Sequence, residues 1–240
     1  MRETNPQSRR RFLHASMGVL AASGLMPLSR LGAKPAVTAA PQNAISPDQA
    51  LQRLMAGNAR YVANKLDPKD FSQGRAARAK AQYPIAAILG CADSRVAPEL
   101  VFDQGPGDLF VVRVAGNYLN GDSLASLEYA VGVLNVPLIM VLGHSQCGAV
   151  KATLGEIKHP SPLPGHIWDI VDAVRPGVEK SIGSGTGDEL DRAIGSNVDY
   201  NVARVAAAQP VLAEAVQQGR IHVVGAVYEL ATGRVQLRGG

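Results

Sequence analysis

The sequence has no apolar segment long enough to span a membrane, no internal repeat and no low-complexity tract. Its N-terminal apolar stretch covers residues 17–28 and is broken by Gly18, Ser23, Gly24 and Pro27. This stretch is too short for a spanning helix, which needs roughly 20 consecutive apolar residues. The absence of a period of about 20 to 50 residues excludes solenoid and propeller folds. A chain of 240 residues with these properties is expected to form one domain.

An excess of positive charge is also absent from most of the chain. The formal net charge is +4, but residues 1–40 alone hold six basic residues and one acidic residue. Residues 41–240 hold 18 basic and 19 acidic residues and are therefore slightly negative. Because nucleic-acid binding needs clustered positive charge on the folded part, no nucleic-acid partner is expected.

Residues 1–40 follow the order of a signal peptide: basic residues, an apolar stretch and then small residues. Arg9-Arg10-Arg11-Phe12-Leu13 precedes the apolar stretch, and this pattern resembles the twin-arginine (Tat) export signal. The resemblance implies export by the Tat machinery, a periplasmic location and cleavage near residues 39–41. A disordered basic tail and a weakly apolar anchor are the alternatives.

Short apolar runs bounded by glycine, proline or polar residues predict the strands. These runs cover residues 85–89, 109–114, 137–142 and 221–228, with a shorter run at 234–237. Strands that alternate with helices indicate parallel pairing and right-handed crossovers. The predicted fold class is α/β, with a mostly parallel central sheet of four strands plus an edge strand, flanked by helices.

Helices are predicted from apolar spacing and capping residues. They cover 46–64 with Ser46 as the cap, 123–134 with Ser123 as the cap, and 198–217 with a break at Pro210. Residues 155–187 are rich in glycine and proline and predict an irregular insertion around a short segment at 167–174. After the signal peptide, the expected organisation is an N-terminal helical arm and linker at 41–82 and an α/β domain at 83–240.

Metal-binding side chains follow two of the predicted strands. Cys91 and Asp93 follow the first strand, and His144 and Cys147 follow the third. If the two strands are neighbours, these side chains converge, and two thiolates with an imidazole and a carboxylate suit tetrahedral zinc. Cys91 and Cys147 are the two cysteines of the sequence, so a disulfide between them is the alternative for an exported protein.

Arg95 lies two residues after Asp93. A guanidinium at this spacing can form a bidentate pair with the carboxylate and draw it from the metal, which opens a coordination position for water. The alternative is that Asp93 is a fixed ligand and Arg95 binds a backbone carbonyl.

Two segments of the chain resemble the β-class carbonic anhydrases. The first resembling segment is Cys91-Ala92-Asp93-Ser94-Arg95-Val96 and the second is His144-Ser145-Gln146-Cys147-Gly148. The similarity covers residues 82–155 and returns at 225–233. It implies one zinc ion per chain, held by Cys91, His144 and Cys147. Asp93 is then either the fourth ligand in a closed state or the partner of Arg95 in an open, active state.

The resemblance also implies substrate-binding residues. Gln82 matches the residue that hydrogen-bonds bicarbonate, Phe110 and Tyr129 match the apolar walls of the carbon dioxide pocket, and Gly148 lies at the pocket mouth. Tyr129 is expected to come across the interface of a homodimer, or of a dimer of dimers. From the residues alone, packing is the default explanation of Phe110 and Tyr129.

The activity implied is the zinc-dependent, reversible hydration of carbon dioxide to bicarbonate and a proton. Zinc lowers the pKa of bound water, and the Asp93–Arg95 pair gates the site. The alternatives are a hydrolase of a carbon dioxide analogue, such as carbonyl sulfide or carbon disulfide, and a non-catalytic zinc- or bicarbonate-binding periplasmic protein. Ala92 and Val114 depart from the residues most frequent in the family at these positions.

Overall fold

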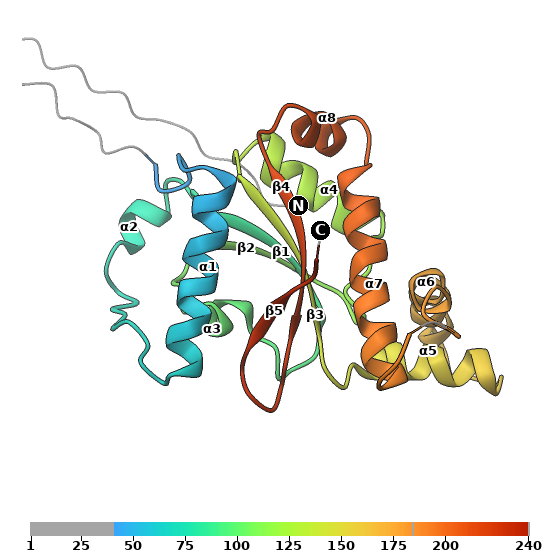
Figure 1. Cartoon of the computed structure of the whole chain (residues 1–240). Helices are drawn as coiled ribbons and strands as arrows, with labels where there is room; N and C mark the ends of the chain where they lie inside the picture. The colour runs from blue at the N-terminus through green and yellow to red at the C-terminus, as the bar shows by residue number, and fades with distance from the viewer. Residues whose placement is uncertain (1–40, 184, 240) are drawn as a thin grey trace, which may run out of the picture. The chain divides into compact units, whose positions relative to one another are not determined.

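The computed structural model describes residues 41–183 and 185–239, and the predicted signal peptide lies outside them. A five-stranded sheet with the order β2-β1-β3-β4-β5 forms the centre of the fold (Figure 1). Four strands are parallel: β1 (Ala86–Gly90), β2 (Leu109–Arg113), β3 (Leu138–His144) and β4 (His222–Tyr228). The edge strand β5 (Val235–Leu237) is antiparallel to β4. The predicted fold class is confirmed.

The two central strands are buried along their whole length. Their sequences, AAILG and LIMVLGH, are nearly continuous apolar runs, as expected where helices cover both faces of a parallel sheet. Side chains of β1 alternate between the two faces: Ile88 packs in the core cluster on one side and Leu89 in the cluster on the other. Helices therefore cover both faces of β1 and β3.

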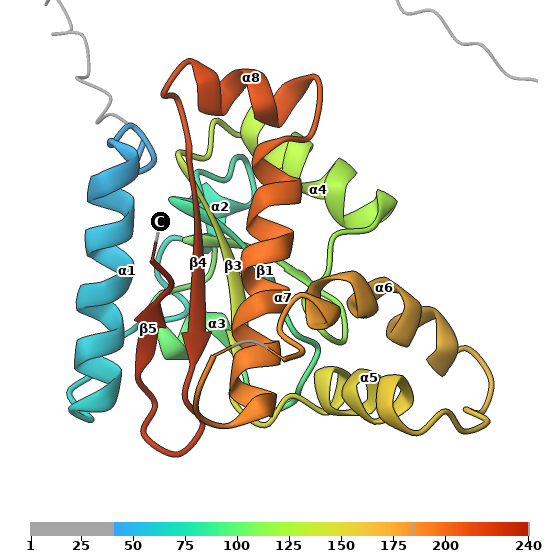
Figure 2. The ribbon, with the colours of Figure 1, turned by 45° about the vertical axis from the view of Figure 1, so that its right-hand side comes forward.

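Helices cover the sheet on both sides (Figures 1 and 2). One side holds α1 (Pro47–Val62), with the short helices α2 (Arg75–Arg78) and α3 (Pro98–Val101) in the same part of the chain. The other side holds α4 (Gly121–Gly132), α7 (Glu189–Ala206) and α8 (Val211–Gln217). Helices α5 (Gly148–Lys158) and α6 (Ile167–Glu179) pack together beside α7. No helix among the described residues is long and apolar enough to cross a membrane.

Helix α1 is fastened to the sheet by apolar and polar contacts. Ser46 caps it in a capping box with Gln49, as predicted for the cap. Ala50 and Leu54 are fully buried in the core cluster that contains Ile88. The buried Asn58 amide donates to the carbonyls of Val101 and Gly233 and accepts from the Val235 N–H. This side chain thus satisfies backbone groups beside β5.

Three helix predictions are corrected by the structure. Asn120, not Ser123, caps α4. Ser123 is the third helical residue; its N–H donates to Asn120 Oδ1 and its Oγ accepts from the Asn120 N–H. The expected irregular insertion at 155–187 contains the end of α5 and the whole of α6. Pro176 and Gly177 argue against a helix, yet a Cβ on Gly177 would lie 2.9 Å from Asn197 Cα, so the glycine permits close packing of α6 on α7.

The third correction concerns the last long helix. It begins at Glu189 with Asp188 as its cap and ends at Ala206, and α8 starts after Pro210. The break near Pro210 is therefore confirmed, while the start was predicted nine residues too late.

Candidate active site

Three metal-binding side chains meet at the carboxyl ends of β1 and β3. The two strands are neighbours, with Gly90 paired to Leu142, so Cys91 follows β1 close to the end of β3, where His144 lies. His144 is the last residue of β3, and Cys147 is the N-cap residue of α5. One ligand atom from each residue lies within 4.8 Å of the other two, and all three side chains are buried. Both cysteines are free thiols.

The imidazole of His144 is oriented to offer a lone pair. Its Nδ1 lies 2.9 Å from the carbonyl oxygen of Ser145, which can only accept, so Nδ1 carries the proton. Its Nε2 is buried and has no hydrogen-bond partner among the described residues. Leaving such a group unpaired is costly. A cation held between Nε2 and the two sulfurs would remove this cost, so the residues present fit a metal ion.

The two thiols differ in their readiness to ionise. A hydrogen bond from Cys147, with smaller effects of His144 and of the Gly116 N–H 3.3 Å from Sγ, lowers the pKa of Cys91 to about 4, against the effect of burial. The pKa of Cys147 is raised, because its thiol donates to Cys91 and because it is buried. Without a cation one sulfur is a thiolate and the other a thiol; a thiolate-binding metal would ionise both.

Asp93 is bound to Arg95 and not to the three-ligand cluster. Arg95 Nε lies 2.9 Å from Oδ1 and its Nη2 lies 2.7 Å from Oδ2, and the Arg95 N–H also donates to Oδ1 at 2.9 Å. These bonds to Arg95 hold the pKa of Asp93 well below its usual range. Asp93 Oδ2 nevertheless lies 3.8 Å from His144 Nε2. The carboxylate therefore stands beside the cluster while paired to a guanidinium.

Arg113 is a residue of the site that the sequence reasoning missed. Its Nε donates to the Cys91 carbonyl at 2.8 Å and its Nη2 donates to the Asp93 carbonyl at 2.6 Å. It ends β2 and pairs in register with Gly90, directly before Cys91. A basic residue at the end of the neighbouring strand was the available signal. Arg113 fixes the backbone that carries the first ligand and the carboxylate.

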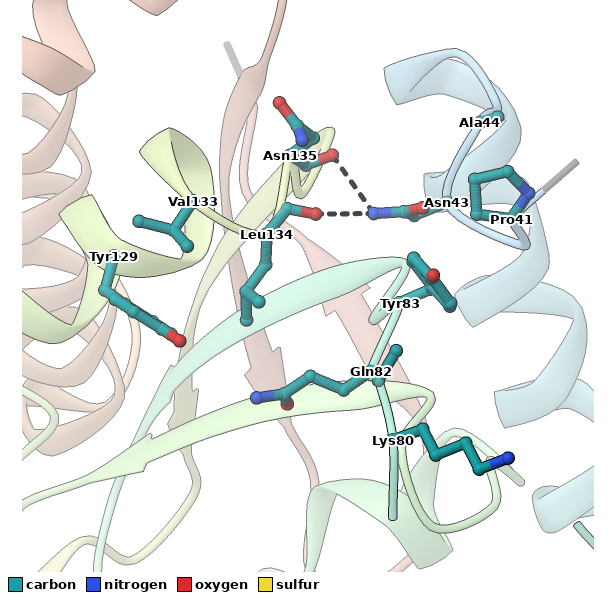
Figure 3. Close-up of a pocket in the computed structure, with 11 residues that line it drawn as sticks. Pro41, Asn43, Ala44, Lys80, Gln82, Tyr83, Tyr129, Val133, Leu134 and Asn135 are labelled. Atoms are coloured by element: carbon teal, nitrogen blue, oxygen red, sulfur yellow. Dashed lines mark hydrogen bonds between the residues drawn. The ribbon is translucent and has the colours of Figure 1, made fainter. Parts of the chain in front are cut away.

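The predicted substrate residues occupy the other end of the sheet. Gln82 and Tyr129 line a pocket of about 510 Å³ together with Tyr83, Val133 and Asn43 (Figure 3). The Phe110 and Tyr129 rings lie 6.3 Å apart between centroids. Gln82 precedes β1 and Cys91 follows it, and the five residues of β1 between them alone span roughly 16 Å. Within one chain these residues are not brought to the metal-binding cluster.

Gly148 does lie at the cluster. It is the first residue of α5, directly after Cys147, and it is exposed. A Cβ at this position would meet no atom within 4 Å. The backbone beside Cys147 is therefore open to a small molecule.

Comparisons with known proteins agree with this arrangement. The sequence profile of the carbonic anhydrase family matches residues 86–235. The carbonic anhydrase of Mycolicibacterium smegmatis is 43% identical over 194 residues, which cover 80% of this chain and 94% of that protein. The chain belongs to the β-class carbonic anhydrases. Carbonic anhydrase 2 of Mycobacterium tuberculosis is also 43% identical, over 196 residues that cover 80% of this chain and 93% of that protein.

Solved structures of β-class carbonic anhydrases share the fold. The β-carbonic anhydrase CcaA superposes with a TM-score of 0.62 at 28% identity and covers 80% of this chain and 89% of its own. The Coccomyxa β-carbonic anhydrase, solved with acetazolamide, gives 0.61 at 32% identity over 80% and 85% of the two chains. This chain is thus an enzyme of the family, and Cys91, His144 and Cys147 form its possible metal site.

Proposed function

We propose that this carbonic anhydrase catalyses the reversible hydration of carbon dioxide to bicarbonate and a proton, with one zinc ion held by Cys91, His144 and Cys147. The observation that carries the proposal is the buried, unpartnered Nε2 of His144 beside two free thiols. Sulfur and imidazole ligands favour zinc over magnesium or calcium. When bound, zinc supplies Lewis-acid activation of water.

Asp93 and Arg95 orient the reacting water. The bidentate pair fixes the carboxylate as an acceptor close to His144 Nε2. An acceptor in this place receives an O–H hydrogen bond and turns a water lone pair toward the carbon of carbon dioxide. If the carboxylate leaves Arg95, it is close enough to become a fourth ligand. Exchange of Asp93 between these two partners is the proposed gate.

The substrate pocket is completed by a second copy of the chain. Gln82, Phe110 and Tyr129 lie together but remote from their own cluster. In a homodimer each chain would present this group to the metal centre of its partner, where Gln82 donates to a bicarbonate oxygen and the two rings exclude water. The side chain of Tyr129 is 46% exposed in the single chain and is free to enter such an interface.

Export by the Tat pathway is the second part of the proposal. It is supported by Arg9-Arg10-Arg11-Phe12-Leu13 ahead of a short apolar stretch. The Tat route would carry the folded enzyme, already loaded with zinc, to the periplasm.

Stopped-flow measurement of carbon dioxide hydration, with zinc quantified in the same sample, tests the activity. We expect about one zinc per chain and hydration that disappears in Cys147→Ser. Ser196→Ala is the control, because it removes a serine hydroxyl that bonds the Gly177 carbonyl between α7 and α6 and not one of the proposed zinc ligands. Bound zinc without hydration would indicate a non-catalytic binding protein. Hydrolysis of carbonyl sulfide or carbon disulfide without hydration would assign the site to an analogue.

A further inference from the structure

Ser145 and Glu229 connect the candidate metal site to the turn between β4 and β5. Ser145 Oγ donates to Glu229 Oε1 at 2.8 Å, and the Leu230 N–H donates to Ser145 Oγ at 3.0 Å. The Ser145 N–H donates to the Tyr228 carbonyl at 2.9 Å. Ser145 is 6% exposed. Its backbone and side chain are thus both held by the end of β4.

Ser145, held in this way, also orients His144. The Ser145 carbonyl is the acceptor of the His144 Nδ1 proton, and this bond decides that Nε2 faces the two sulfurs. Ser145 follows β3, whereas its partners lie at the end of β4 or directly after it, so the contact spans two neighbouring strands. A change in the backbone conformation of Ser145 would move its carbonyl oxygen and release the imidazole.

Glu229 is itself fixed by the turn. Its Oε1 also accepts from the Ala231 N–H at 3.2 Å, and its backbone N–H donates to the Arg234 carbonyl at 2.8 Å. Gly233 has a φ of +73°, a backbone conformation that favours glycine, and closes the turn. The carboxylate oxygen therefore has a defined position before any metal binds.

We propose that Ser145 and Glu229 form a brace that positions the imidazole of His144 for the metal, so that the β4–β5 turn sets the metal affinity. The inference rests on the proposed zinc site. Groups that orient a histidine ligand in this indirect way typically change metal affinity by about 10- to 100-fold when they are removed. Glu229 and Ser145 act through His144 and are positioning residues.

The test compares four single variants and one double variant of the full chain. Glu229→Ala and Ser145→Ala break the brace. Glu229→Gln keeps an oxygen acceptor for the Ser145 hydroxyl without the charge. Ser196→Ala is the matched control, since it removes a serine hydroxyl that bonds a backbone carbonyl, Gly177, at 2.6 Å elsewhere in the fold. Zinc affinity is measured by competition with a chelator, and ligand geometry by the visible spectrum of the cobalt-substituted protein.

We expect Glu229→Ala and Ser145→Ala to lose about 10-fold or more in zinc affinity and to alter the cobalt spectrum. Glu229→Gln and Ser196→Ala should match the wild type in both measurements. The double variant Ser145→Ala/Glu229→Ala should bind zinc no more weakly than the weaker single variant, because both changes remove one brace.

Urea unfolding of the metal-free proteins separates positioning from folding. The brace proposal would be wrong if Glu229→Ala and Ser145→Ala unfold as cooperatively as the wild type and also match it in zinc affinity and cobalt spectrum. Equal losses in Glu229→Gln and Glu229→Ala would also overturn it. If the wild-type protein binds zinc but hydrates no carbon dioxide, the proposed function is wrong. The comparison of zinc affinities between the variants and the wild type still tests the brace in that case.

Discussion

Gly143, the residue before His144 on β3, is expected to be required because α7 packs directly on it. A Cβ built on Gly143 would lie 2.6 Å from Cγ2 of Val198 and 3.5 Å from Cγ2 of Ile194. Gly225 on β4 lies beneath the same valine, and its Cβ would be 2.8 Å from Val198 Cγ1. Both glycines belong to extended strands without positive φ. They provide space for the helix and not a special backbone conformation.

Gly143→Ala should therefore destabilise the protein by about 1–2 kcal/mol. Overpacking of a core costs roughly 1–3 kcal/mol, and the lower entropy of an unfolded chain with alanine returns about 0.4–1 kcal/mol. Val198→Ala, at a fully buried position, should cost about 2 kcal/mol by leaving a cavity. In the double variant the new methyl group occupies the space left by Val198 Cγ2. The destabilisation of the double variant should therefore be smaller than the sum of the two single destabilisations by about 1 kcal/mol or more.

Equilibrium urea unfolding of the metal-free proteins measures this coupling. Gly155→Ala is the control, since a Cβ there meets no atom within 4 Å and alanine in a helix is favoured by about 1 kcal/mol over glycine. Additivity of Gly143→Ala and Val198→Ala within about 0.5 kcal/mol would refute the packing argument. Zinc affinity should fall in Gly143→Ala and be restored in the double variant, because His144 is the next residue.

Three further predictions concern charge and metal. Asp93→Ala and Arg95→Ala should keep zinc but lose about 100-fold or more of the hydration rate, and full activity in either variant would remove the gate from the mechanism. Burial raises the pKa of Asp103, but Lys69, the Asp67 N–H and Arg60 lower it to about 2. Because the pKa of Asp103 in the folded protein lies below the unfolded value of 3.8, Asp103→Asn should lower the free energy of unfolding by about 2 kcal/mol at pH 7. This difference between variant and wild type should vanish as the pH of the urea unfolding experiment falls from about 4 to 2. A difference that does not change with pH would contradict the prediction. After zinc removal and denaturation, thiol titration should find both cysteines reduced, whereas a disulfide would argue against the metal site.

The parts of the fold that the sequence predicts are those decided by local patterns. The buried strands are apolar runs ended by glycine or proline, and the break near Pro210 follows from a missing N–H. Helix α6 was missed because Pro176 and Gly177 read locally as helix breakers. Their tolerance depends on a partner helix that no local pattern reveals. The choice of Asn120 over Ser123 as the cap of α4 is similar, since either residue can cap.

The metal-binding cluster could be predicted because two loops with metal-binding side chains follow strands that were expected to be neighbours. The pairing of Asp93 with Arg95 was one of two interpretations of their spacing, and the structure has that pair. Arg113 and Glu229 were missed, because each acts through the register of a neighbouring strand or turn. The separation of Gln82 from the cluster was available from the sequence, because the predicted strand at 85–89 lies between Gln82 and Cys91.

The placement of the cluster and of Gln82 at opposite ends of β1 has a consequence for mixtures of two variant chains. Two inactive chains, one carrying Asp93→Ala and the other Gln82→Ala, can complement each other if each centre is shared between subunits. A mixed pair then contains one centre with both defects and one with neither. Since random pairing makes half of the dimers mixed, co-refolding should recover about a quarter of wild-type activity, whereas either variant refolded alone should remain inactive.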